Sequence, residues 1–217
     1  MKYFLIFAVL IALRVVAYPL VKRLVATLFL RTAVKGALED VGAKALVSVP
    51  DRIVLVHQNL HSWNPAPEVA RLGDALFSKG FQEGGLYSIR EIPGATVRFL
   101  VKPAECVVAA IFMLPRAGPW LDLITYYQNG NTATFSTNAP RGLDQRPGHP
   151  IVHLPGATPL ALFTKLSAER PKGVFRPVMT EDIVPLFERT YAEAMTWRKT
   201  RGISATEVVK VAQRKAG

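Results

Sequence analysis

The strongest constraint on the fold comes from short apolar segments that alternate with turn sequences between residues 86 and 136. Residues 96–102 alternate apolar and polar side chains, which is the period of a strand with one buried face. Residues 106–114 read CVVAAIFML and are apolar throughout, as expected for a central strand covered on both faces. Asn129-Gly130 favours a type I′ hairpin turn, which needs a positive φ at both central positions.

These segments predict an antiparallel meander of about five strands, and the patterns on either side of it predict helices. The expected strands of the meander are 86–92, 96–102, 106–114, 120–128 and 131–136, with a further short strand over 52–57. The expected helices are 68–79, 158–169, 180–201 and a short one that starts at residue 204. The fold class that follows is α+β, an antiparallel sheet with helices packed on it.

Local signals mark where three of these helices begin or end. Thr158 stands where an N-cap is expected, with Pro159 in the first turn. Gly202 is expected to stop the long helix before it. Ser204 and Glu207 have the spacing of a capping box, in which each side chain accepts a hydrogen bond from the other residue's backbone N–H.

The N-terminal region contains an apolar segment, residues 4–21, with one charge at Arg14. As a helix it would be roughly 27 Å long, which is about the thickness of the bilayer's hydrocarbon core. Inserting Arg14 would cost about 2.5–3.5 kcal/mol, whereas each Phe, Leu, Ile or Val contributes about −0.3 to −0.6 kcal/mol. Twelve such residues outweigh the arginine, so we expect a transmembrane helix or signal anchor. A signal peptide cleaved near Val15-Val16-Ala17 and a membrane-associated or buried helix are the alternatives.

Basic residues follow this segment at helical spacing. Arg23, Thr27, Arg31 and Lys35 recur every four residues and would form one row on a helix. Such a row suits anionic lipid headgroups, at about 1 kcal/mol for each cation near the surface; an ordinary solvated helix face would look the same. Positive charge after the apolar segment predicts a single-pass protein with residues 22–217 on the cytoplasmic side.

The net charge of +11 is concentrated at the two ends of the chain. Residues 1–48 carry +5 and residues 186–217 carry +4, which leaves +2 for residues 49–185. We therefore divide the chain into an N-terminal anchor and amphipathic segment, 1–48, with a hinge around 37–50, and one α+β domain, 49–217. A nucleic-acid-binding domain would carry its basic residues on a folded face, so nucleic acid is not an expected partner.

A thirteen-residue polar loop, 138–150, holds the candidate ligand-binding residues Arg141, Asp144, Arg146 and His149. Long ordered loops often carry function. Arginines can hold a phosphate or carboxylate, and an Asp–His pair can transfer protons. The alternative is that Asp144 pairs with an arginine and ties the loop down.

The four histidines fall in two pairs, His57/His61 and His149/His153, with the spacing that puts metal ligands on one face of a helix. Neither pair falls on a predicted helix, so we expect no metal site. Cys106 is the single cysteine, which excludes an intrachain disulfide, and we expect it to be a small buried apolar residue.

Motifs for nucleotide binding and serine hydrolysis are missing from the sequence, which has no P-loop, G-x-G-x-x-G or G-x-S-x-G. We therefore predict no cofactor and no catalytic residue. Several aromatic residues could line a ligand cleft or a protein interface, although such residues more often pack in a core or on a sheet face. They are Trp63, Trp120, Tyr126, Tyr127 and Trp197.

These observations predict a membrane-anchored accessory or scaffold protein without enzymatic activity. Its expected partners are the lipid bilayer and a larger membrane protein assembly, because Arg14 within the apolar segment is uncompensated and can pair with a group inside such an assembly, if it does not snorkel to the interface. One alternative is a module that binds a lipid or other small apolar molecule between sheet and helices. Another is an enzyme with its site in the 138–150 loop.

Overall fold

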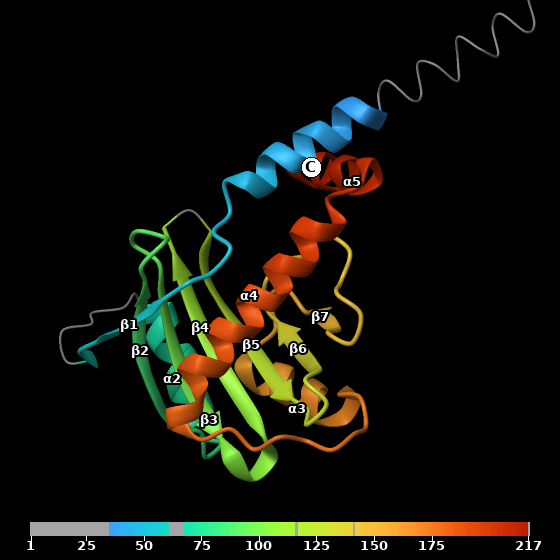
Figure 1. The fold of residues 1–217 in the computed structure, drawn as a ribbon. Helices are drawn as coiled ribbons and strands as arrows, with labels where there is room; N and C mark the ends of the chain where they lie inside the picture. The colour runs from blue at the N-terminus through green and yellow to red at the C-terminus, as the bar shows by residue number, and fades with distance from the viewer. Residues whose placement is uncertain (1–34, 61–66, 116, 141, 217) are drawn as a thin grey trace, which may run out of the picture. The chain divides into compact units, whose positions relative to one another are not determined.

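The computed structural model describes residues 35–60, 67–115, 117–140 and 142–216, and the chain divides into two compact units. The sheet unit is Ser48–Arg201. The terminal unit combines Met1–Val47 with Gly202–Gly217. Its described part is a helix over 35–47 and the C-terminal helix α5 (Ala205–Ala216) (Figure 1).

The sheet unit is built on one seven-stranded sheet whose strands lie side by side in chain order. The strands are β1 (Leu55–Gln58), β2 (Gln82–Ile89), β3 (Thr96–Lys102), β4 (Val107–Leu114), β5 (Gly118–Tyr126), β6 (Thr132–Ser136) and β7 (Ile151–His153). Neighbouring strands are antiparallel except β6 and β7, which are parallel. The α+β fold with an antiparallel meander is therefore confirmed, but five strands was too few.

The two additional strands lie at the edges of the sheet. Strand β1 corresponds to the predicted short strand and pairs with β2, with Leu55 opposite Ile89. Strand β7 pairs with β6, with Ile151 opposite Thr134, and it has three residues. So short a strand has no visible alternation in the sequence, and its parallel partner is fixed only when the 138–150 loop closes.

Helix α4 (Ile183–Arg201) runs across one face of the sheet (Figure 1). Alternate residues of β3 point to this face and are fully buried. The helix covers them with its own apolar residues, and the rings of Phe187 and Phe99 lie 5.1 Å apart. The buried residues shared by this core include Val97, Phe99, Val101, Ala110, Ile183 and Leu186.

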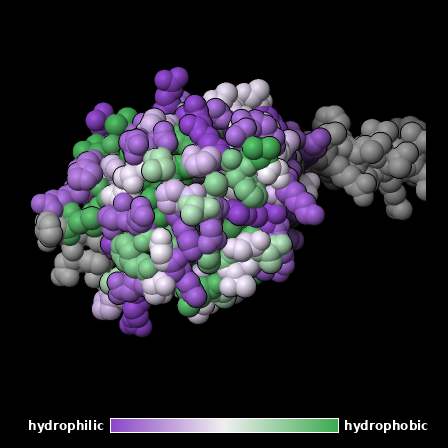
Figure 2. All heavy atoms as spheres, turned by 90° about the horizontal axis from the view of Figure 1, so that it is seen from below, coloured by the Kyte–Doolittle hydropathy of each residue, from purple (hydrophilic) through white to green (hydrophobic). Residues whose placement is uncertain are grey.

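Helices α2 (Pro67–Phe77) and α3 (Pro159–Glu169) cover the opposite face of the sheet. Strand β4 contributes alternate residues to the two cores, so its continuous apolar sequence is explained by burial on both faces. The second core includes Val69, Leu76, Leu100, Ala109, Ile111, Leu121, Phe135, Leu162 and Leu166. With the interior filled in this way, hydrophobic residues are interspersed with hydrophilic ones on the face shown in Figure 2.

The hairpin between β5 and β6 differs from the predicted type I′ turn. Gly130 has φ of 85°, but Cys106 is the one non-glycine residue of the described ranges with a positive φ, so Asn129 does not have one. Gly130 N–H donates to the carbonyl of Tyr127 at 3.0 Å, and Tyr127 N–H donates to the carbonyl of Asn131 at 3.0 Å. This is the pattern of a longer hairpin loop with glycine in the left-handed position.

The predicted helix ends are confirmed. Thr158 Oγ1 accepts a hydrogen bond from the N–H of Ala161 at 3.2 Å. Glu207 Oε2 accepts from Ser204 N–H at 2.9 Å, while Ser204 Oγ accepts from Glu207 N–H at 3.3 Å. Gly202 follows α4 with φ of 77°. These signals involve residues close together in the sequence, so they do not depend on the rest of the fold.

One local prediction, for Cys106, is wrong, and the segment predicted to form a hinge is helical. The helix over 35–47 continues through Gly42. A Cβ there would lie 2.9 Å from Cβ of Ile203, so the glycine permits close packing within the terminal unit. Cys106 is half-buried with φ of 55° and precedes β4 in a turn, rather than opening the strand as a buried apolar residue.

Helix α3 offers a matched test of the second core. Leu162 is fully buried, whereas Leu160 is 38% exposed. We expect Leu162→Ala to lower the free energy of unfolding by about 2–5 kcal/mol, because it removes buried apolar atoms and leaves a cavity. Leu160→Ala should cost less than about 1 kcal/mol. Urea unfolding followed by circular dichroism checks both, and equal losses would contradict the packing described.

Candidate functional site

Helix α4 holds the 138–150 loop through charged side chains. The carboxylate of Asp144 forms an ion pair with Arg201. The backbone carbonyl oxygen of Asp144 accepts a hydrogen bond from Arg198 Nη2 at 3.1 Å. The guanidinium of Arg146 contacts the carboxylate of Glu193 at 3.3 Å. Asp144 thus makes an arginine contact of the kind that ties a loop down.

His149 is held at a different place. Its Nδ1 shares a hydrogen bond of 2.9 Å with Oγ1 of Thr132, at the start of β6. Asp144, Arg146 and His149 therefore each bond to a different side chain, although the charge of Arg146 lies close enough to His149 to affect its pKa. Arg141, the fourth candidate, lies outside the described residues.

The environment of His149 favours the neutral imidazole. Burial lowers the pKa of His149 below its ordinary value of 6.5, and the nearby charge of Arg146 lowers it further. Glu193 acts in the opposite direction and is the weakest of the three influences. At neutral pH the ring is therefore uncharged, as its contact with the Thr132 hydroxyl also allows.

The lowered pKa of His149 makes stability depend on pH. The unfolded state binds the proton more readily, so the contribution of His149 is fully present above about pH 6.5 and decreases as the pH falls below it. We expect the His149→Gln variant to lose less stability than the unmodified protein between pH 7.5 and pH 5. An NMR titration of the ring protons provides the direct check, and a pKa above 6.5 for His149 would contradict it.

Gln145 has a role that sequence reasoning missed. Its Nε2 donates to the carbonyl of Ile151 at 2.7 Å, and its Oε1 accepts from the N–H of Ile151 at 3.0 Å. Ile151 lies on β7, the edge strand. The side-chain amide thus pairs with the backbone as a neighbouring strand would, and it covers part of an edge that could otherwise pair with another chain. A glutamine in a polar loop gives no sequence signal for this contact.

Gln145→Ala should expose this edge. Both hydrogen bonds are solvent-exposed and water can replace them, so we expect a stability loss of about 0.5–1.5 kcal/mol. The more sensitive readout is amide hydrogen exchange, which should become faster at Ile151. Gln128→Ala, a glutamine replaced in the adjacent hairpin, is the control. Unchanged exchange at Ile151 in Gln145→Ala would contradict the assigned role.

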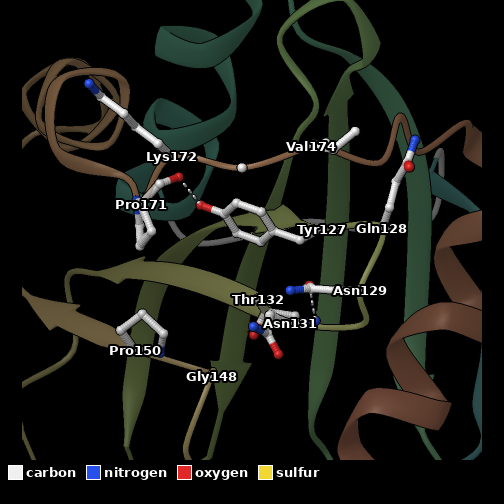
Figure 3. Close-up of a pocket in the computed structure, with 11 residues that line it drawn as sticks. Tyr127, Gln128, Asn129, Asn131, Thr132, Gly148, Pro150, Pro171, Lys172 and Val174 are labelled. Carbon is white, nitrogen blue, oxygen red and sulfur yellow. Dashed lines mark hydrogen bonds between the residues drawn. The ribbon is translucent and has the colours of Figure 1, made fainter.

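A pocket of about 340 Å³ lies at the end of the β5–β6 hairpin (Figure 3). Three segments line it, the hairpin itself, the end of the 138–150 loop and the segment that follows α3. In Figure 3 the ring of Tyr127 extends toward the segment after α3, where its hydroxyl donates to the carbonyl of Pro171 at 2.6 Å. The lining residues are Tyr127, Gln128, Asn129, Asn131, Thr132, Gly148, Pro150, Pro171, Lys172, Gly173 and Val174.

The polar groups that line this pocket are side-chain amides, the hydroxyls of Tyr127 and Thr132, backbone groups and one ammonium group. No carboxylate is among its lining residues, and Lys172 supplies a positive charge. Burial raises the pKa of Tyr127, although Arg170 opposes the effect, so the phenol stays protonated. Thr132 joins the pocket to His149, yet the described residues show no third group that would orient this imidazole as a general base.

The remaining sequence candidates are placed as follows. Within the described ranges, no three His, Cys, Asp or Glu side chains gather in a way that could hold a metal ion. The ring of His57 packs against Tyr87 with centroids 5.5 Å apart, while His61 and Trp63 lie outside the described residues. Trp120 stacks on Phe112.

The predicted membrane contacts lie mostly outside the described part of the chain. This applies to residues 4–21 and to Arg14, Arg23 and Arg31. Lys35 is described, and its Nζ lies 3.8 Å from a carboxylate oxygen of Glu39 one turn later. Among the helices that are described, none is long and apolar enough to cross a bilayer.

Comparison with known proteins identifies no relative. The chain matches no protein family, no curated protein and no solved structure.

Proposed function

We propose that this chain is a membrane-anchored accessory protein that docks on a larger membrane protein assembly and has no enzymatic activity of its own. The observation that carries the proposal is the apolar segment 4–21, which belongs to a basic unit made from both ends of the chain. Cytoplasmic placement of the sheet unit is part of the proposal, since cations after a span favour that side.

The two units differ in their density of positive charge. The terminal unit carries ten Lys and Arg against three Asp and Glu, a net charge of +7. The sheet unit, although much larger, carries seventeen against thirteen, a net charge of +4. Positive charge is therefore densest in the part of the chain that contains the apolar segment, as anchoring at an anionic surface would require.

The contacts of the sheet unit favour a docking role over the two alternatives. Side chains of two hydrophobic cores occupy both faces of the sheet, which is where a lipid-binding module would need its cavity. The loop residues expected to serve an enzyme are engaged with α4 and Thr132. Both features support a rigid domain that presents its surface to a partner.

Alkaline carbonate extraction tests the anchor. We expect the full chain to remain in the membrane pellet, and Leu10→Arg to release it, because a second charge in the segment costs about 2.5–3.5 kcal/mol. Leu160→Arg places the same charge on the exposed surface of the sheet unit and should leave the chain in the pellet. Complete extraction of the unmodified chain would overturn the anchoring.

Mild detergent solubilisation followed by native electrophoresis tests the docking. We expect the chain to migrate with a larger assembly, Arg14→Leu to weaken that association, and Arg14→Lys to preserve it because the charge is kept. A chain that migrates as a lone monomer in all three forms would contradict the accessory role while leaving the anchor intact.

A further inference from the structure

We propose that the terminal unit lies on the anionic membrane surface, with helix 35–47 and α5 both touching lipid. The C-terminal helix would then be a second membrane contact, about two hundred residues along the chain from the apolar segment. This inference rests on the proposed anchoring through residues 4–21, because surface contact of this kind is weak without a second membrane signal.

Exposed apolar side chains are concentrated in the terminal unit. Its described part has 28 residues, yet it contains three of the nine large hydrophobic residues that are exposed in the described ranges. Val47 is 82% exposed, Val41 56% and Val209 39%. The other six are spread over the sheet unit, where the density of exposed apolar residues is less than half as high.

The packing of helix 35–47 explains why these valines face outward. Gly42 and Leu46 are buried, and Gly42 is the residue that Ile203 approaches closely. Val41, Lys44 and Val47 follow one another at intervals of three residues, so they form a row on the side of the helix away from that contact. An ammonium group thus stands between two exposed valines.

Helix α5 also has an exposed valine beside an exposed lysine. Val209 and Lys210 are adjacent and exposed, whereas Glu207 is buried and serves the capping box. On helix 35–47, Lys44 lies 2.9 Å from Asp40, but both side chains are largely exposed. Such pairs contribute little to stability, so a lipid phosphate can replace the carboxylate.

Charge and composition favour lipid over a protein as the occupant of this surface. Of the unit's net charge of +7, residues 1–34 contribute +5 and residues 202–216 contribute +2, whereas helix 35–47 is neutral. The charge that complements an anionic bilayer therefore comes from α5 and from the sequence that precedes Lys35. Residues 35–47 and 202–216 contain no Trp, Tyr or Phe, the types that dominate many protein interfaces. Thirteen residues separate the apolar segment from Lys35, so the anchored segment and this unit are close in sequence.

Site-specific fluorescence on the full chain tests the inference. In a Cys106→Ser background, Val209→Cys and Val47→Cys carry an environment-sensitive dye, and Val174→Cys, a 65% exposed valine of the sheet unit, is the matched control. The chain is reconstituted in vesicles of phosphatidylcholine alone or with 30% phosphatidylglycerol. Brominated lipids then quench any dye that contacts the acyl chains, and circular dichroism checks that each variant is folded.

We expect quenching at positions 209 and 47 in the anionic vesicles, little in the neutral ones, and none at position 174. Lys44→Glu and Lys210→Glu should each shift the equilibrium between the lipid-bound and the unbound terminal unit about fivefold or more toward the unbound form. A chain that resists carbonate extraction but shows no quenching at 209 or 47, or equal quenching in both vesicle types, overturns the surface contact and leaves the anchor standing. A chain extracted by carbonate overturns the anchor itself.

Discussion

Burial of the central strands on both faces is the constraint on which the sheet unit depends. Strands β3, β4 and β5 pair in an antiparallel register that sends alternate side chains to opposite faces, and each face receives buried apolar residues from all three strands. Such a sheet cannot leave either face in water. The chain therefore supplies α2 and α3 for one face and α4 for the other, and their placement determines where the connecting loops run.

Helix α4 connects this packing to the electrostatics of the molecule. Its apolar residues cover the sheet, and its charged residues hold Asp144 and Arg146 of the 138–150 loop. The basic residues at the end of α4 thus stabilise the sheet unit itself. When these residues are counted with the sheet unit to which they belong, positive charge is densest in the terminal unit.

The features that were predicted correctly depend on residues close together in the chain, and those that were missed depend on distant segments. The strand over 96–102, the cap at Thr158 and the capping box at Ser204 were predicted because each depends on neighbours within a few residues. Strand β7 and the role of Gln145 were missed, since both depend on loop closure. The loop residues Asp144 and Arg146 were noticed for their charge, but their partners lie 57 and 47 residues away.

The α+β class, most of the meander and the helix ends follow from local sequence patterns, because side-chain periodicity and turn chemistry act over a few residues. The apolar character of residues 4–21 and the excess of positive charge are likewise properties of the sequence. Tertiary packing was needed to fix the parallel edge strand, the partners of His149 and Asp144, and the grouping of helix 35–47 with α5 in one unit. These contacts join segments far apart in the chain, and their energies exist only once the sheet and its covering helices have brought those segments together.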